Sequence, residues 1–372
     1  MNKKVIIFLI SIIVIIFIIL FCKSVLFKVQ ENEDIYLVEQ EGNLYKVVNN
    51  SELSTFDIEY QELISSKIET LLKKKYKFEK PLMVLNPYGT NTCGVNIYFN
   101  TKEEVEISYT VSVDKEGISD FSRVLKNDSE DNFTKVHKYQ IIGLIPGEIN
   151  NLKLVGTSRS GERQEVDLIV DMTSVECEAP IVLDMSDGTS DGLDLSSNTS
   201  NGISISSSSV EKLEDGLFGV FAGGKPNYIY DNNGVLRANL ALEYEQCYRI
   251  IFHNGEMFYK YGENVIGVIN RLGRIKKEYV VPTHRLHHEY VFDEENMKMI
   301  SLATSYEEQE SRVGDFIVVI DLISGEVDKV IDMKDLLPEM YKIARDSYGN
   351  RVNYNGQGMD WIHVNSLSLV ER

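Results

Sequence analysis

The chain has little basic character, few cysteines and a single tryptophan. Its 372 residues carry 38 Lys and Arg against 57 Asp and Glu, which gives a net charge of −19. A surface of this sign cannot displace counterions from a phosphate backbone, so nucleic acid is excluded as an expected partner. Four cysteines lie far apart without any CxxC pair, at Cys22, Cys93, Cys177 and Cys247. The sequence therefore indicates no cysteine-based metal or redox site, and one disulfide stays open.

The N-terminus contains the only long apolar run that looks like a membrane segment. Two lysines, Lys3 and Lys4, precede an 18-residue run from Val5 to Cys22 that is apolar apart from Ser11. This length fits a membrane span, and the lysines predict a cytoplasmic N-terminus. The residues before Lys23 lack the small side chains of a cleavage site. We expect residues 1–27 to be an uncleaved single-pass anchor in the cell membrane, with the rest of the chain extracytoplasmic.

Residues 28–80 are predicted to be a connector followed by one amphipathic helix. Between Ser54 and Lys75, apolar residues recur with the spacing of three and four that marks one helix face. They are Phe56, Tyr60, Leu63, Ile64, Ile68, Leu71 and Leu72. The pattern lasts under three heptads, so packing within its own domain is favoured over a coiled coil.

Residues 81–171 have the pattern of short β-strands. From Val105 to Val113 apolar and polar residues alternate, and further strands are predicted over 95–99, 136–142, 152–155 and 165–170. Frequent turn residues and the absence of a helical period predict a small antiparallel β-sandwich. The next segment, Asp184 to Ser209, is rich in Ser, Gly, Asp and Asn and is expected to be a linker-like loop.

A hairpin pattern repeats in residues 172–372. Three stretches consist of an apolar strand, a turn with glycine and a second strand, and their glycines are Gly234, Gly273 and Gly325. The intervals are 39 (273 − 234) and 52 (325 − 273) residues, which is typical of propeller blades. At roughly 45 residues a blade, about four blades are expected here. The predicted fold is therefore all-β: anchor and helix, sandwich, then propeller.

Two histidine motifs carry the candidate chemistry. The first runs from His284 to Glu289 and contains His287 and His288; the second, Asp360 to Ser366, contains Trp361, His363 and Asn365. If the second is a strand, its Trp, His and Asn share one face, and two adjacent histidines on a strand point to opposite faces. Two alternatives remain open, a metal site on the first motif and a purely structural role for both.

Together with Asn86-Pro87-Tyr88-Gly89, these motifs resemble those of the bacterial PAPS-independent aryl-sulfate sulfotransferases, from about Pro81 to Arg372. The resemblance implies a β domain followed by a six-bladed propeller. It also implies transfer of a sulfuryl group from a phenolic sulfate donor to a phenol acceptor through a sulfated histidine, without metal or other cofactor. The chain has no glycine-rich loop of the kind that a nucleotide-dependent enzyme would need.

Carried over by motif, the resemblance implies that His363 and His288 are catalytic and that Asn365 and His287 bind substrate. It places the sulfated histidine and a sulfate-binding arginine beyond the second motif. With about four of six blades present, we expect the chain to be a fragment that is inactive by itself. The alternative is a non-catalytic, membrane-anchored propeller that binds a ligand or a partner protein, and a homodimer stays open.

Overall fold

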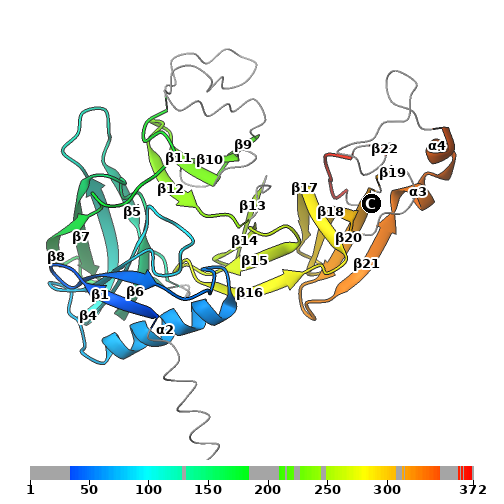
Figure 1. Cartoon of the computed structure of the whole chain (residues 1–372). Coiled ribbons are helices and arrows are strands. Elements are labelled where there is room, and N and C mark those ends of the chain that lie inside the picture. Colours follow the sequence, from blue (N-terminus) through cyan, green and yellow to red (C-terminus); the bar gives the residue numbers. More distant parts are fainter. Residues whose placement is uncertain are drawn as a thin grey trace, which may run out of the picture.

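The computed structural model is built almost entirely from β-strands (Figure 1), which confirms the all-β prediction. It describes residues 34–127, 131–183, 209–213, 216–221, 227–243, 249–306, 312–313, 315–343, 359–360, 362 and 364–370. The predicted anchor at residues 5–22 lies outside these ranges, as does nearly all of the predicted linker. No helix within the described ranges is long and apolar enough to cross a membrane.

The first half of the described chain contains eight strands and one long helix. Their bounds are β1 Ile35–Glu39, β2 Leu44–Asn49, α2 Ile58–Leu72, β3 Leu82–Leu85, β4 Val95–Ser112, β5 Phe121–Val124, β6 Thr134–Ile141, β7 Ile149–Ser158 and β8 Arg163–Asp171. The second half contains mainly short strands. They are β9 Ser209–Lys212, β10 Leu217–Phe221, β11 Asn227–Asp231, β12 Leu236–Leu240, β13 Ile250–His253, β14 Glu256–Lys260, β15 Val265–Ile269, β16 Ile275–Val280, β17 His284–Asp293, β18 Lys298–Ser305, β19 Arg312–Val313, β20 Phe316–Asp321, β21 Val327–Asp332 and β22 Met359–Asp360, with two short helices, α3 Met333–Leu336 and α4 Pro338–Ile343.

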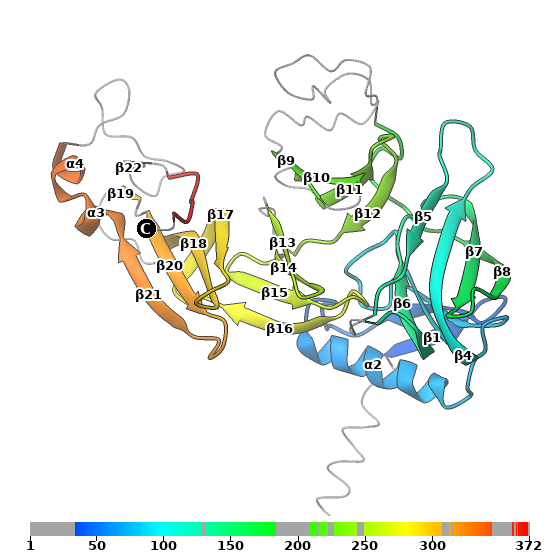
Figure 2. The ribbon, with the colours of Figure 1, turned by 180° about the vertical axis from the view of Figure 1, so that it is seen from behind.

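The predicted sandwich is one curled eight-stranded sheet organised by β4. The first half of β4 pairs with β3 and β6, and its second half pairs with β5 and β7. The register breaks between Asn100 and Val105, so two predicted strands are one bent strand of 18 residues. From Val105 to Ser112 the side chains alternate between buried and half-buried, as the sequence pattern predicts. Because a single strand passes between both halves, the sheet curls into a half-barrel (Figure 2).

The predicted connector contributes to this sheet. β1 and β2 form a hairpin, and β2 pairs in parallel with β3. The helix α2 is confirmed, and it buries Tyr60, Ile64 and Ile68 against the apolar side chains of β1, β3 and β4. Burial of side chains of this size contributes roughly 1.5–3 kcal/mol each. Residues 34–171 thus form one packed unit, while the domain boundaries drawn from the sequence stay predictions.

Three four-stranded antiparallel sheets follow the curled sheet. In chain order they are β9–β12, β13–β16, and β17, β18, β20 and β21. Gly234, Gly273 and Gly325 each occupy the turn between the third and fourth strands, with φ of 73°, 77° and 84°. Glycine suits these turns because it alone adopts positive φ without steric cost. The repeat is therefore confirmed as three blade-like sheets, and after Ile343 the described residues contain only the short strand β22.

The three sheets follow one another along an arc, with their first strands β9, β13 and β17 on its inner side (Figures 1 and 2). Their last strands β12, β16 and β21 lie on the outer side. A motif on β17 is therefore placed on the concave side of the arc, where the central channel of a propeller would lie. This placement is what makes the histidine motif of β17 a candidate site.

Polar contacts bind the curled sheet to the first two sheets of the arc. The buried Arg237 of β12 donates from Nε to Asp231 Oδ2 at 2.8 Å and from Nη2 to the Ser119 carbonyl at 2.7 Å. Gln61 of α2 donates to the Tyr88 carbonyl and accepts from the Ile275 backbone N–H of β16 at 3.0 Å. These contacts fix the position of the arc relative to the curled sheet.

Candidate active site on the inner strand of the third sheet

The first histidine motif forms a bulge in β17. Leu286 pairs with Ala303 and Tyr290 pairs with Ser301, so three residues of β17, from His287 to Glu289, face a single residue of β18. His288 has a φ of 50°, which is uncommon for a side chain other than glycine. Bulges and strained residues of this kind concentrate at functional sites, because they redirect side chains that a regular strand would place elsewhere.

The bulge brings the two predicted histidines together. Their rings meet edge to face with centroids 5.0 Å apart. The prediction that adjacent histidines point to opposite faces is therefore wrong here, since it assumed a regular strand. Both imidazoles can contact the same small ligand, which is what transfer of a compact group with several oxygens requires.

His287 is largely buried, and both of its ring nitrogens can still form a hydrogen bond. Its side chain is 12% exposed, and neither ring nitrogen has a hydrogen-bond partner among the described residues. The carboxylate of Asp315 lies nearby, with Oδ1 3.9 Å from Nε2. Burial, followed by the charge of His288, lowers the pKa of His287 to about 4, and the approach of the ring to the Ala303 backbone offsets part of this effect. At neutral pH the ring is therefore uncharged, with one N–H to donate and one nitrogen to accept.

Glu289 connects the two motifs. Its Oε1 accepts a hydrogen bond from Arg249 Nη1 at 2.8 Å, and its Oε2 accepts one from the backbone N–H of Leu367 at 2.9 Å. Leu367 follows the second motif by one residue. The second motif begins in β22, which pairs in parallel with β19, two residues before Asp315. Two segments more than 70 residues apart in sequence thus meet beside the bulge.

The structure describes only part of the second motif. Trp361 and His363 lie outside the described residues, so the geometry of these two predicted site residues is not placed. Asn365 is exposed and lies in an irregular segment, residues 364–370. Among the described residues of the motif, only Met359 and Asp360 are in a strand. The predicted Trp-His-Asn alternation falls on two residues outside the described ranges, so it stays a prediction.

Three residues near the bulge were not predicted from the sequence. Asp315 precedes β20, and Lys260 is buried at the end of β14, where its charge disfavours protonation of His287. Arg249 precedes β13 and binds Glu289. None belongs to a motif, and no spacing in the sequence signals them. They add positive charge and a carboxylate to a site predicted from histidine and asparagine alone.

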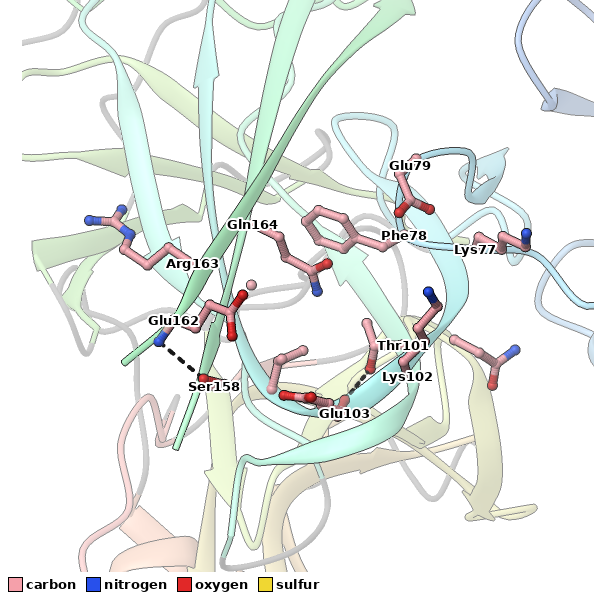
Figure 3. Close-up of a pocket in the computed structure, with 13 residues that line it drawn as sticks. Lys77, Phe78, Glu79, Thr101, Lys102, Glu103, Ser158, Glu162, Arg163 and Gln164 are labelled. Atoms are coloured by element: carbon pink, nitrogen blue, oxygen red, sulfur yellow. Dashed lines mark hydrogen bonds between the residues drawn. The ribbon is translucent and has the colours of Figure 1, made fainter. Parts of the chain in front are cut away.

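The cysteines and the other acidic and histidine side chains give no second catalytic cluster. Cys93 and Cys177 form no disulfide, and Cys247 lies outside the described residues. No group of three His, Cys, Asp or Glu side chains within the described ranges is arranged to hold a metal ion. A cavity of about 590 Å³ lies at one end of the curled sheet, between Phe78, Thr101 and Gln164 (Figure 3), and none of the predicted site residues lines it.

Comparisons with known proteins identify the two halves of the chain. Residues 201–372 match the family model of arylsulfotransferase (ASST), and residues 82–173 match the model of the arylsulfotransferase Ig-like domain. No curated protein matches the sequence.

Two solved structures with a low likeness to this chain are the following. The computationally designed Ika8 protein aligns at 10% identity with a TM-score of 0.23, over 64% of this chain and 58% of its own. A DUF4784 family protein from Bacteroides caccae aligns at 11% identity with a TM-score of 0.21, over 64% of this chain and 67% of its own. Likenesses of this degree carry no argument about the fold. The two family models, which together match both the Ig-like and the catalytic regions, show that the chain belongs to the arylsulfotransferase family.

Proposed function

We propose that the protein moves a sulfuryl group from a phenolic sulfate ester to another phenol, without PAPS and through a sulfohistidine. In the first step the S–O bond to the donor breaks as an S–N bond to a histidine forms, and the donor leaves as a phenol after taking a proton. In the second step the acceptor phenol loses its proton, its oxygen attacks sulfur, and the S–N bond breaks. Atoms and charge balance without an oxidant, a reductant or a nucleotide.

The single observation that supports this proposal most strongly is the contact between the two motifs. Glu289 accepts from Arg249 and from the backbone of Leu367, which holds the segment of Asn365 beside His287 and His288. Sulfuryl transfer needs hydrogen-bond donors around three equatorial oxygens, and two segments that meet can supply them from different directions. The family model over residues 201–372 adds the class of reaction.

Each site residue has a proposed role. His288 and His363 contact the sulfuryl oxygens and the phenolic oxygen that leaves the donor. His287 and Asn365 bind the sulfuryl group; His287 suits this role because its uncharged ring has no hydrogen-bond partner among the described residues. The nucleophile is assigned to none of these four. We further propose that residues 5–22 anchor the protein in the cell membrane, with the site on the extracytoplasmic side.

The experiment that tests the proposal separates binding from transfer. Binding of 4-nitrophenyl sulfate to the full chain is measured by calorimetry, and transfer to added phenol by release of 4-nitrophenol. We expect His287→Ala and His288→Ala each to weaken binding at least tenfold, about 1.4 kcal/mol. His253→Ala serves as the matched control, because His253 is a half-buried histidine that packs on Phe292 outside the bulge.

The two outcomes of the transfer measurement decide between enzyme and binding protein. Transfer that is lost in His363→Ala while binding is retained supports the catalytic role. Binding without any transfer by the wild type fits the alternative, a non-catalytic propeller that takes up a ligand, and it fits equally a chain that lacks the sulfated histidine, so binding in the two bulge variants is the deciding readout. If neither histidine of the bulge affects binding, the site assignment fails.

A further inference from the structure

A second cavity lies between the curled sheet and the first two sheets of the arc. Its volume is about 350 Å³, and residues of β4, β6, β11, β12 and β15 contribute to its wall. The interior is largely apolar, with Ile142, Leu217, Ile229 and Ile269 among the lining side chains. None of the residues proposed to bind the sulfuryl group lines it. The volume fits one or two fused aromatic rings, and apolar cavities at domain junctions are common ligand sites.

The side chains that line this cavity include three cations and no anion. Arg123, Lys126 and Arg271 belong to its lining, and among its described lining residues none is Asp or Glu. Lys126 and Arg271 are exposed, whereas the apolar lining residues Ile229 and Ile269 are buried. In a chain with a net charge of −19, such a local excess of positive charge departs from the average surface. Positive charge at the mouth of a small cavity attracts anions from solution.

One cation lies against the main chain at this mouth. Gly255, in the turn between β13 and β14, has a φ of 76°, and a Cβ there would overlap the guanidinium of Arg271. Gly255 and Arg271 both line the cavity, so the guanidinium lies at its wall in space that glycine leaves open.

Aromatic and apolar side chains are exposed at the same mouth. Phe252 is 53% exposed and Val124 is 50% exposed, and Tyr109 and Tyr139 line the cavity further in. Exposed apolar surface next to a cavity gains about 25 cal/mol for each Å² that a ligand covers. The combination of aromatic walls and cationic rim selects for a molecule with an aromatic body and a negative charge.

We propose that this cavity binds small aromatic monoanions, of the sulfonate, sulfate or carboxylate type, at a site separate from the histidine bulge. The ring enters between Ile142 and Ile229, and the anionic group stays at the rim with Lys126 and Arg271. The inference goes beyond sulfuryl transfer and does not depend on it. An aryl sulfate has the same chemistry, so the site would also take the donor class proposed above, without reacting with it.

The test uses 2-naphthalenesulfonate, whose C–S bond does not permit sulfuryl transfer. Its binding to the full chain is measured by calorimetry and by quenching of naphthalene fluorescence. We expect Lys126→Gln and Arg271→Gln each to weaken binding at least fivefold, and the neutral 2-(methylsulfonyl)naphthalene to bind at least tenfold more weakly. Arg163→Gln is the matched control, because Arg163 is an exposed arginine that lines the other cavity.

The contrary results are equally definite. Equal binding of the neutral and anionic probes, or unchanged binding in both rim variants, would overturn the proposal. Loss of binding in His287→Ala with no effect of the rim variants would place the probe at the bulge. Since Lys126 is exposed, Lys126→Gln is expected to fold normally. Because 4-nitrophenyl sulfate can enter both sites, the two proposals are separated by their variants: His287→Ala tests the bulge, and Lys126→Gln and Arg271→Gln test the cavity.

Discussion

Two histidines in different regions of the molecule share a lowered pKa but differ in the hydrogen bonds of their rings. In the curled sheet, His137 is 1% exposed, stacks on Phe99 and has both ring nitrogens within 3.2 Å of a hydroxyl, Thr101 Oγ1 and Tyr139 OH. In the bulge of β17, neither ring nitrogen of His287 has a hydrogen-bond partner among the described residues. Burial is the main cause that lowers the pKa of each to about 4.

Hydrogen bonding of the ring distinguishes a structural histidine from one that can bind a ligand. A buried polar group without a partner costs roughly 1–3 kcal/mol, and such a cost persists where a ligand supplies the partner. His137 is satisfied and holds strands together. His287 is held beside Asp315 and His288 with its nitrogens available. Acidity alone does not distinguish the two, whereas hydrogen bonding does.

The largest expected effect concerns a fully satisfied polar group at the junction. Arg237→Met should lower the free energy of unfolding by about 3–5 kcal/mol, because it leaves Asp231 buried without its cation. Urea unfolding of the variant and the wild type measures this. The control is Arg163→Met at an exposed arginine, with an expected change within about 0.5 kcal/mol. A decrease in the free energy of unfolding below about 1 kcal/mol in Arg237→Met would show that the ion pair with Asp231 does not stabilise the junction.

The pH dependence of stability tests the acidity that both histidines share. In the folded protein each histidine stays uncharged down to about pH 4, whereas in the unfolded chain it takes up a proton near its ordinary pKa of 6.5. The unfolded chain therefore binds more protons between pH 6.5 and about 4. The contribution of each uncharged histidine to the free energy of unfolding is fully present above pH 6.5. It decreases as the pH falls to 4, by on the order of 3 kcal/mol for each histidine. The measurement is the unfolding free energy at pH 7 and pH 4.5 for the wild type and for His137→Gln. An equal pH slope in both proteins would contradict the prediction.

Truncation of each histidine separates the two roles. His137→Ala should cost about 2 kcal/mol, since it removes two hydrogen bonds and a ring stack. His287→Ala should change stability by less than about 1 kcal/mol, because it removes no hydrogen bond to a described residue. Binding of 4-nitrophenyl sulfate should show the reverse order. The comparison fails if His287→Ala destabilises the protein as much as His137→Ala.

The smallest effect is expected at Glu289. Glu289→Gln leaves one acceptor oxygen for two donors, so it loses one of the two hydrogen bonds and should cost about 1 kcal/mol, mostly as local opening of residues 364–370. Hydrogen exchange at the Leu367 amide should become roughly fivefold faster, which corresponds to about 1 kcal/mol. Exchange at α2 amides serves as the internal control and should not change. An unchanged Leu367 rate would mean that the carboxylate does not hold this segment.

Much of the fold could be predicted because it depends on local pattern. The apolar spacing of three and four gave α2 within the predicted span, and the three glycines lie at positive φ in equivalent turns. The bend of β4 and the pairing of β1 and β2 with β3 could not be predicted, since they depend on which strands meet. Alternation alone cannot tell a sandwich from a curled sheet.

The site roles predicted for the histidines stay predictions, and the geometry around them could not be read from the sequence. The structure brings the two motif segments next to one another, through the contact of Glu289 with Leu367. The bulge that joins the two rings is set by pairing with β18 and leaves no mark in the local sequence. Asp315 and Lys260 reach the site from other strands, which no single-sequence spacing reveals.

Ring ¹⁵N NMR of the histidines tests most directly whether the ring nitrogens of His287 can bond to a sulfuryl group. Signals are assigned with His137→Gln and His287→Ala, and 4-nitrophenyl sulfate is then titrated at pH 7. We predict that the His287 nitrogen shifts change on saturation while those of His137 stay constant, because only His287 gains a partner. Constant His287 signals in a protein that binds the ester would contradict the account.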